Sequence, residues 1–344
     1  MFLNTELFGH QRGASNKGYK KIKYGTMVLS TQNLHLGNAN VNLRFDHGMV
    51  SPAYKTYVIT GCSVDLIAQW IKSDAAKRFF YNATTVGASV CRRNVEWDTL
   101  YEQSLYLPCR DEQEKVAKFL GLLSNRINKQ QRFVSALKKY KRGVTAKLIA
   151  AIEEKYPVVR LGDHVTVMRG GSPRPIDAYI TNAENGIRWI KIGDALPDQL
   201  YISDTKEKIK PEGAKKSRRV YAGDLILSNS MSFGRPYILK VDGCIHDGWL
   251  LIRDEEKKFD KRFLCFYLAS DVTLAQYKKY AAGSCVNNLN SELVASVEIG
   301  MPPIEQQIRM ANILEKIDRQ VEAASTMHLL LSKLRSSLLQ QLFI

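Results

Sequence analysis

The chain lacks the features of several common protein classes. Its six cysteines are widely spaced among 344 residues without a C-x-x-C pair, which argues against a disulfide scaffold and a zinc ribbon. No stretch approaches the roughly 18 consecutive apolar residues that a membrane-spanning helix needs. Residues 1–13 have no apolar core of the signal-peptide type. We therefore expect a cytoplasmic protein with reduced cysteines and no membrane association.

Motifs of catalysis are also missing. The sequence has no G-x-x-x-x-G-K-[ST] loop, no glycine-rich dinucleotide fingerprint and no histidine pair at metal-ligand spacing. It has no Asn/Asp-Pro-Pro-aromatic motif that could hold a base amino group for methylation. His246 and Asp247 could form an acid–base pair, but a turn with a local hydrogen bond is the stronger interpretation. We expect no catalytic residue, no metal site and no cofactor in this chain.

Positive charge is abundant. The chain has 50 Lys and Arg against 34 Asp and Glu, a net charge of +16 that attracts polyanions. Residues 1–155 carry +12 of this charge, and Lys115–Ile152 contains ten basic residues and no acidic one. A second basic cluster spans Lys206–Arg219. Each cluster alone could be a solvated surface, but together they favour nucleic acid as the partner.

An internal repeat organises the sequence. Leu107-Pro108 and the residues after it return 194 positions later as Met301-Pro302, and Gly25–Ser30 return as Gly223–Ser228 at an offset of 198. After each proline, apolar residues recur in alternating steps of four and three, which is typical of coiled-coil helices. The positions predicted to pack between the two helices are Val116, Leu120, Leu123, Ile127, Val134, Leu137, Val144, Leu148, Met310, Leu314, Ile317, Val321, Leu331, Leu338 and Leu342.

These patterns predict the fold class α+β: two mixed α/β domains, each followed by a long helix, with the two helices packed as an antiparallel coiled coil. The predicted segments are residues 1–107 and 157–300 for the domains, and 108–156 and 301–344 for the helical regions. Gln130, Lys141 and Arg335 interrupt the apolar seam and either fix its register or face a third partner.

The first copy of the repeat is shorter than the second. Pro157–Val220 precedes Gly223 in the second copy, whereas only 24 residues precede Gly25 in the first, a difference of about 40 residues. Either the chain begins inside a longer reading frame or its first domain is partial. The function of the first domain depends on which of these holds.

The second copy contains several motifs in order. They are Val159–Asp163, Gly186–Asp194, Gly223–Ser228 and, most specifically, Met301–Gln307 leading into the heptad helix. Together with the tandem repeat, they resemble the specificity subunit of type I restriction-modification enzymes over nearly the whole chain. The resemblance implies two target recognition domains, one for each half of a bipartite double-stranded DNA sequence, and helices that set the gap between the halves.

The resemblance also implies partner proteins. Two adenine-methylating subunits that carry S-adenosylmethionine would dock on the helices, and restriction subunits would join to form the ATP-dependent nuclease. S-adenosylmethionine, ATP and magnesium are then expected on these partners. Outward-facing apolar residues would support such docking. We predict this role for Phe119, Phe133, Ile149, Ile313 and Leu339.

DNA recognition divides the candidate residues into two groups. Lysine and arginine neutralise phosphates, whereas residues that can bond base edges recognise the sequence, and asparagine pairs well with adenine. In the second domain we predict phosphate contacts by Lys215, Lys216, Arg218 and Arg219, and base contacts by Arg235, Asn229, Asn287 and Asn288. Their counterparts in the first domain are Lys20, Lys21, Arg92, Arg93 and Asn94. The alternative for each is a solvated charge or a turn residue.

Other functions stay open at this point. A DNA-binding scaffold or repressor without methylation partners is the main alternative, and it predicts a monomer whose helical seam is satisfied internally. A nuclease that acts alone is the least favoured interpretation because no catalytic motif supports it.

Overall fold

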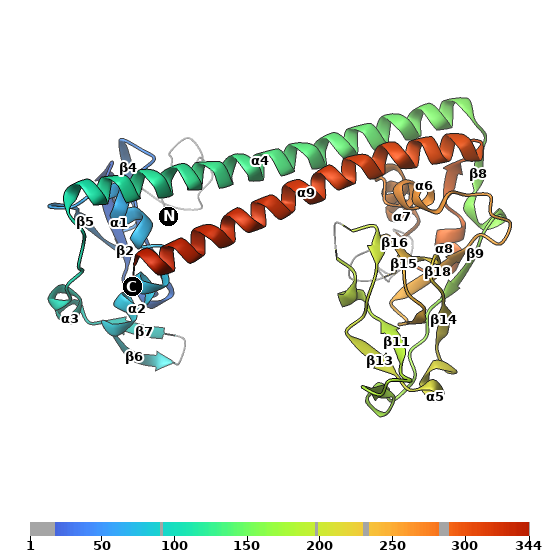
Figure 1. Ribbon diagram of the computed structural model, residues 1–344, viewed down its shortest axis with the longest axis horizontal. Coiled ribbons are helices and arrows are strands. Elements are labelled where there is room, and N and C mark those ends of the chain that lie inside the picture. Colours follow the sequence, from blue (N-terminus) through green and yellow to red (C-terminus); the bar gives the residue numbers. More distant parts are fainter. Residues whose placement is uncertain (1–17, 90–91, 197–198, 230–233, 282–288, 344) are drawn as a thin grey trace. The chain divides into compact units, whose positions relative to one another are not determined.

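The computed structural model describes residues 18–89, 92–196, 199–229, 234–281 and 289–343. The chain divides into two compact units (Figure 1). Unit 1 comprises residues 1–133 and 324–344, and unit 2 comprises residues 134–323. The division falls inside helices α4 (Arg110–Lys155) and α9 (Ile304–Leu342), so each unit combines a globular part with segments of both helices. None of the described helices is both long enough and apolar enough to cross a membrane.

Two sheets form the body of unit 2. In its described residues, one five-stranded sheet has the order β10-β13-β11-β17-β14, the other has the order β12-β16-β15-β18-β9, and β19 pairs with β8. The strands β15 and β16 are buried at every position, which explains their largely apolar sequences. The bounds are β8 Val158–Arg160, β9 Thr166–Arg169, β10 Ile180–Thr181, β11 Ile187–Ile190, β12 Tyr201–Ile202, β13 Glu207–Ile209, β14 Arg218–Val220, β15 Leu225–Ser228, β16 Pro236–Leu239, β17 Gly243–Ile245, β18 Trp249–Arg253 and β19 Glu298–Gly300.

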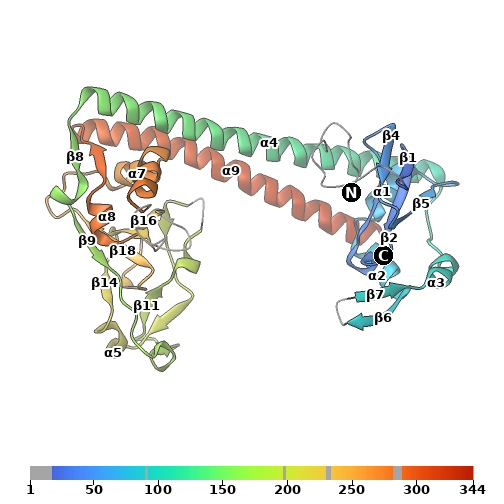
Figure 2. The same ribbon diagram turned by 180° about the vertical axis from the view of Figure 1, so that it is seen from behind.

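Short helices join these sheets to α4 and α9. The side chain of Asp260 caps α6 by accepting hydrogen bonds from two backbone N–H groups, and six consecutive residues of α6, Phe263–Leu268, are buried. Figure 1 shows α6 and α7 beside α9 in this unit, and α7 is seen there from behind in Figure 2. The helices are α5 Pro211–Ala214, α6 Lys261–Leu268, α7 Asp271–Ala281 and α8 Ser291–Ala295, with 3-10 turns η2 Leu161–Asp163, η3 Ile176–Ala178 and η4 Ile192–Asp194.

Unit 1 has smaller sheets. Its described strands form the three-stranded sheet β3-β2-β5 and the pairs β1-β4 and β6-β7. Its core contains Trp70 and Phe80, with the Trp70 ring 5.2 Å from the Phe79 ring. The bounds are β1 Lys20–Lys23, β2 Thr26–Ser30, η1 Leu34–Leu36, β3 Ala39–Val41, β4 His47–Val50, β5 Tyr54–Val58, α1 Val64–Trp70, α2 Asp74–Asn82, β6 Thr84–Ser89, β7 Arg92–Val95 and α3 Trp97–Glu102.

The sequence repeat is also a repeat of strand pairing. Strand β2 pairs with β3 and β5 as β15 pairs with β16 and β18, and β1 pairs with β4 as β14 pairs with β17. Gly25 and Gly223 form equivalent turns with φ angles of 81° and 89°, a conformation that glycine adopts without strain. In unit 2 the sheet continues beyond β17 to β11, β13 and β10. The described part of unit 1 has no counterpart of these three strands.

A buried glutamine anchors α9 to the domain before it. Gln307 is 1% exposed. Its Oε1 accepts from the backbone N–H of Asp260 at 2.9 Å, and its Nε2 donates to the carbonyl oxygens of Pro302 (2.9 Å) and Lys258 (3.1 Å). Because Asp260 is the N-cap of α6, this one side chain joins the start of α9 to the start of α6.

The equivalent glutamine does the same in unit 1. Gln113 lies 194 positions before Gln307 and is also buried. Its Oε1 accepts from the N–H of Ser63, the N-cap of α1, at 2.8 Å, and its Nε2 donates to Pro108 O at 2.9 Å. The repeat of Pro and Gln in the sequence is therefore a repeated anchor of helix to domain.

Polar residues that interrupt the helical seam have partners within their own units. In unit 1, Gln130 Nε2 donates to Ala324 O at 2.9 Å, and Arg335 donates to Ser124 Oγ (3.0 Å) and Gln69 Oε1 (2.7 Å). Burial lowers the pKa of Arg335. These bonds favour the interpretation that the polar residues fix the register of the helix segments.

In unit 2 the equivalent cation makes an equivalent contact. Lys141 Nζ lies 2.5 Å from Asp318 Oδ1 and 5.1 Å from the centre of the Phe266 ring. Lys141 and Arg335 are 194 positions apart, as are Ser124 and Asp318. The same pair of repeat positions therefore joins the α4 and α9 segments in each unit.

The predicted packing positions differ in burial. Leu120, Val134, Met310, Leu314, Ile317 and Val321 are buried, whereas Val116, Leu123, Ile127, Leu137, Val144, Leu148, Leu331 and Leu338 are half-buried. Leu342 departs from the prediction because it is 44% exposed. It is the last residue of α9, where a helix end offers fewer neighbours.

Two residues predicted to face outward are buried instead, so that prediction was wrong. Ile149 is 0% and Leu339 is 4% exposed. Each helix buries a second stripe besides its seam. Ile149 belongs to the core of unit 2 together with Leu161 and Ile299, and Leu339 occupies the repeat position of the buried Thr145. Phe119, Phe133 and Ile313 are exposed, as predicted.

We predict that Gln307→Ala lowers the free energy of unfolding by about 1–3 kcal/mol, because it leaves the buried N–H of Asp260 without an acceptor. Urea denaturation of the full chain measures this. Gln320→Ala, an exposed glutamine on the same helix, is the matched control and should change stability by less than about 0.5 kcal/mol. Equal effects of the two substitutions would contradict the anchoring role.

Candidate nucleic-acid interface

A basic edge strand is the first element of the candidate interface. Among the described strands, β14 is the last of its sheet, so no described strand pairs with its other side. Val220 is buried in the core, whereas Arg218 and Arg219 are exposed. Arg218 Nε donates to the carbonyl oxygen of Arg169 at 3.1 Å, which holds the start of its guanidinium group in place. The strand thus presents two of the predicted phosphate-binding side chains to solvent.

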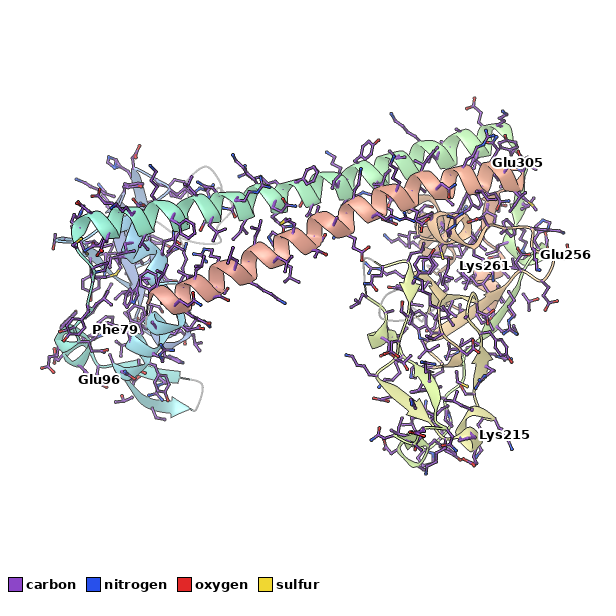
Figure 3. All side chains as sticks on the ribbon, viewed as in Figure 1. Phe79, Glu96, Lys215, Glu256, Lys261 and Glu305 are labelled. Carbon is purple, nitrogen blue, oxygen red and sulfur yellow. The ribbon has the colours of Figure 1, made fainter. Side chains whose placement is uncertain are left out.

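Lys215 and Lys216 extend this basic surface. They follow α5 directly, and both are exposed. Lys216 Nζ donates to Tyr179 Oη at 2.6 Å and lies 5.1 Å from the centre of that ring. Figure 3 shows Lys215 beside α5, at the end of unit 2 opposite α9. All four predicted phosphate contacts of the second domain therefore lie on one continuous segment of chain.

The turn between β17 and β18 is fixed by a carboxylate. Asp247 accepts from Ser172 Oγ (2.8 Å) and His246 Nε2 (2.9 Å) and lies 3.4 Å from an Arg174 nitrogen. Burial raises the pKa of Asp247, but the Ser172 hydrogen bond and the charges of His246 and Arg174 outweigh it and hold that pKa below its usual range. The contacts of the ionised Asp247 carboxylate are therefore fully formed at pH values above the ordinary carboxylate pKa. They are lost as the pH falls through the lowered pKa of Asp247.

His246 and Asp247 form a local turn, as the sequence indicated. The backbone N–H of Gly248 donates to His246 Nδ1 at 2.9 Å, so Nε2 is the ring nitrogen that donates to Asp247. His246 also lines a cavity of about 590 Å³ together with Trp189, Lys191 and Glu207. Among the described residues no group of three His, Cys, Asp or Glu side chains could hold a metal ion.

Asn229 is a structural residue, and its prediction as a base contact needs correction. It is 3% exposed, its Nδ2 donates to Asp247 O at 2.9 Å, and its backbone N–H donates to Gly248 O at 2.9 Å. Its amide is used inside the domain and is not available to a base edge. Asn287 and Asn288, the other two predicted base contacts of this type, lie outside the described residues.

Arg235 has the exposure that a base contact requires. Its backbone N–H donates to Ser228 Oγ at 3.0 Å, and its carbonyl oxygen accepts from the Ser228 N–H at 2.9 Å. These two bonds fix the backbone at the entrance to β16 while the side chain is exposed. Arg235 lines a groove together with residues of α4. This groove is separate from the end of unit 2 that carries Lys215.

The first domain has a basic strand in the equivalent place. Lys20 and Lys21 lie on β1 and pair with Val50 and Met49, as Arg218 and Arg219 pair with residues of β17. Lys21 is exposed, whereas Lys20 Nζ donates to the carbonyl oxygen of Tyr54 at 2.7 Å. The structure thus brings Lys20 and Lys21 together on one strand.

The other candidates of the first domain lie on the hairpin of β6 and β7. Arg93 donates to Thr84 Oγ1 (2.8 Å) and Thr84 O (2.6 Å) and lies 4.2 Å from the Tyr81 ring centre. Its guanidinium group stabilises the hairpin, and its contact with DNA stays a prediction. Asn94 is exposed, and Arg92 lies on β7 with a side chain outside the described part.

Comparison with known proteins decides the family. The model of the type I restriction modification DNA specificity domain matches residues 153–328, just over half of the 344-residue chain. The chain belongs to this family. It is a specificity subunit of type I restriction-modification systems, and its function is DNA sequence recognition.

Similar specificity subunits are found in Methanocaldococcus jannaschii. The chain is 24% identical over 346 residues to the protein assigned as the type I restriction enzyme MjaX specificity subunit, covering 94% of this chain and 73% of that one. It is 24% identical over 277 residues to the MjaVIII specificity subunit, covering 72% of this chain and 62% of that one. The chain thus spans less than two thirds of the MjaVIII protein.

Solved structures of type I systems share the fold. One, from work on the complex assembly and conformational transition of a type I restriction-modification system, has a TM-score of 0.60 at 18% identity and covers 96% of this chain and 84% of that chain. The specificity subunit from M. genitalium has a TM-score of 0.59 at 12% identity, covering 97% and 86%. These comparisons support the mixed helix and sheet architecture of a specificity subunit.

We predict that Asp247→Ala destabilises this specificity subunit by about 1–3 kcal/mol, because Ser172, His246 and Arg174 lose a charged hydrogen-bond acceptor. Chemical denaturation measures the change. Asp177→Ala removes an exposed carboxylate of the same cavity and serves as the control, with an expected effect within about 0.5 kcal/mol. If Asp247→Ala were as mild as Asp177→Ala, the carboxylate would not fix the turn.

Proposed function

We propose that this specificity subunit recognises a bipartite double-stranded DNA sequence, with one half-site contacted by each domain. The helices α4 and α9, packed as an antiparallel coiled coil, would set the gap between the half-sites. The subunit would scaffold two adenine-methylating subunits and the restriction subunits. The finding that carries the proposal is the pair of repeat-equivalent basic strands.

The two basic strands support one binding mode for both domains. Lys20 and Lys21 on β1 occupy the same register positions as Arg218 and Arg219 on β14, relative to their partner strands. Cations on an exposed strand neutralise backbone phosphates and so fix the position of a domain on the duplex. If the two domains contact their half-sites in the same way, each domain needs cations at equivalent positions, as these two strands have.

An apolar stripe on α4 supports partner docking. Phe119, Leu122, Phe133 and Tyr140 are 52–60% exposed. At about 100° per residue they fall within about 60° of one another around the helix. Exposed apolar groups aligned in this way indicate a protein-binding surface, whereas a stand-alone scaffold has no need of them. A methylation subunit is the partner we propose for this stripe.

In this proposal the subunit itself performs no chemistry. Methyl transfer from S-adenosylmethionine, and cleavage driven by ATP with magnesium, would take place on the partner subunits. The contribution of this chain is selection of the DNA site, through base contacts such as Arg235 and phosphate contacts such as Lys215.

Co-purification with the neighbouring methylation subunit, followed by sequencing of the DNA that the complex methylates, tests this function. We expect a bipartite motif with methyl-adenine in both halves. Methylation of one half only would locate a defect in the first domain. A subunit that binds DNA but no methylation subunit would support the stand-alone scaffold instead.

The two kinds of DNA contact have distinct signatures. We predict that Arg235→Ala relaxes specificity at one position of the target, with about 1–3 kcal/mol less discrimination there, because a base-edge bond is lost. Lys215→Ala should weaken binding to all sequences alike. Competition binding with single-position variants of the target measures both effects. A uniform loss from Arg235→Ala would reject its role as a base contact.

Substitution of the α4 stripe tests partner docking. We predict that Leu122→Asp together with Phe133→Asp prevents co-purification of the methylation subunit, because two charges replace apolar groups at the centre of the contact. Asn128→Asp is the control, because Asn128 is exposed on the same helix but lies about 120–140° around it from Leu122 and Phe133. Unchanged association of the double variant would exclude this stripe as the docking surface.

A further inference from the structure

A basic groove lies between α4 and the globular part of unit 2, apart from β14. It has a volume of about 790 Å³. Helix α4 contributes Lys138, Lys139, Lys141 and Arg142 to its lining, and Arg235 enters it from the start of β16. Among the described lining residues of this groove, the five cations face one acidic side chain, that of Asp318.

The carboxylate of this groove is already engaged. Asp318 Oδ1 lies 2.5 Å from Lys141 Nζ, so this pair is close to neutral as a unit. Lys138, Lys139 and Arg142 are exposed, and α4 itself contributes no Asp or Glu between Lys115 and Ile152. Asp271 lines the adjoining hollow with Lys138 and Arg142, so five cations meet two carboxylates. The groove therefore carries an excess of positive charge, and an anion that enters it can displace water and counterions.

The faces of α4 separate this groove from the apolar stripe. At about 100° per residue, Lys138 and Arg142 lie within about 40° of each other, while Tyr140 and Phe133 lie on the opposite side of the helix. The domain-facing side of α4 is apolar at Ile149 but cationic at Lys138 and Arg142. A partner on the apolar stripe would leave the cations of the groove accessible.

We propose that this groove binds the phosphate backbone of duplex DNA, and so adds a contact outside the basic strands. The proposal rests on the function proposed above. One turn of α4 advances about 6 Å between Lys138 and Arg142. This is close to the axial rise of two nucleotides at about 3.4 Å each. Arg235 lies in the same groove, so one DNA strand can meet a base contact and phosphate contacts together.

The α9 helix shows that two of the cations, Lys138 and Arg142, are not a requirement of the fold, whereas Lys139 corresponds to Lys333. The repeat positions of Lys138 and Arg142 on α9 are Ser332 and Ser336. The same helical side therefore tolerates short neutral side chains in unit 1. In this proposal, the charges of Lys138 and Arg142 serve phosphate binding in unit 2. Lys141 has a structural role instead, because the cation at its repeat position, Arg335, also makes a structural contact.

The salt dependence of DNA binding tests the groove. The triple variant Lys138→Gln, Lys139→Gln, Arg142→Gln is compared with Lys118→Gln, Lys129→Gln, Lys147→Gln, which removes three exposed charges from the other side of the same helix. Full-length chain, in the assembly in which it purifies, is titrated with duplex DNA over a range of salt concentrations. We expect the groove variant alone to flatten the plot of log K against log salt, by about 0.9 per lost phosphate contact and so about 2.7 in all.

Further variants and readouts separate the outcomes. The charge-preserving variant Lys138→Arg, Lys139→Arg, Arg142→Lys should retain the wild-type slope, which excludes a folding defect as the cause. Equal slopes for the groove variant and its control would overturn the proposal while leaving site recognition intact. Loss of a protein subunit with an unchanged slope would assign the groove to an acidic partner instead. Absence of any DNA binding by the wild-type chain would refute the proposed function itself.

Discussion

The glutamine at the start of each long helix is the contact on which the other features depend. Gln307 and Gln113 each satisfy a buried backbone N–H of a domain helix and a proline carbonyl of their own segment. A buried N–H without a partner costs about 1–3 kcal/mol, so the start of the helix cannot rotate away from the domain at low cost. Because that rotation is fixed, the side of each helix start that meets its own domain is fixed as well. Burial of Met310 and Leu314 on α9, and of Ala117 and Leu120 on α4, follows from it.

In the proposed function, charge on the edge strands would serve both recognition and solubility. β14 ends its sheet, and an unpaired edge can template pairing with another chain unless charges prevent it. Arg218 and Arg219 place two cations there, and Lys21 does so on β1. The same side chains can neutralise DNA phosphates, so a single feature protects the free subunit from aggregation and prepares it for its ligand. Asn229 shows the limit of this reasoning, because its buried amide is used to hold a turn.

The repeat and the heptad pattern predicted much of the architecture. Local signals were sufficient for the two long helices and for the strands around Gly25 and Gly223, because side-chain periodicity and turn glycines act over a few residues. The second buried stripe was missed, since a helix with two packing partners has no single apolar seam, and Thr145 and Gln113 are polar members of it. Asn229 could not be assigned from sequence for a related reason. Its hydrogen-bond partners, Asp247 and Gly248, are distant along the chain and meet it only in the folded sheet.

The two repeats share anchors but differ in charge, and the difference has a physical consequence. Both have the buried glutamine, the basic edge strand and a cation between the helix segments, Lys141 or Arg335. Only the α4 repeat places Lys138 and Arg142 where α9 has serines. The difference is local, because unit 1 has 20 Lys and Arg against 10 Asp and Glu, whereas unit 2 has 30 against 24. Lys138 and Arg142 therefore raise the potential beside the groove of unit 2, where a phosphate would lie, without making unit 2 the more basic of the two units.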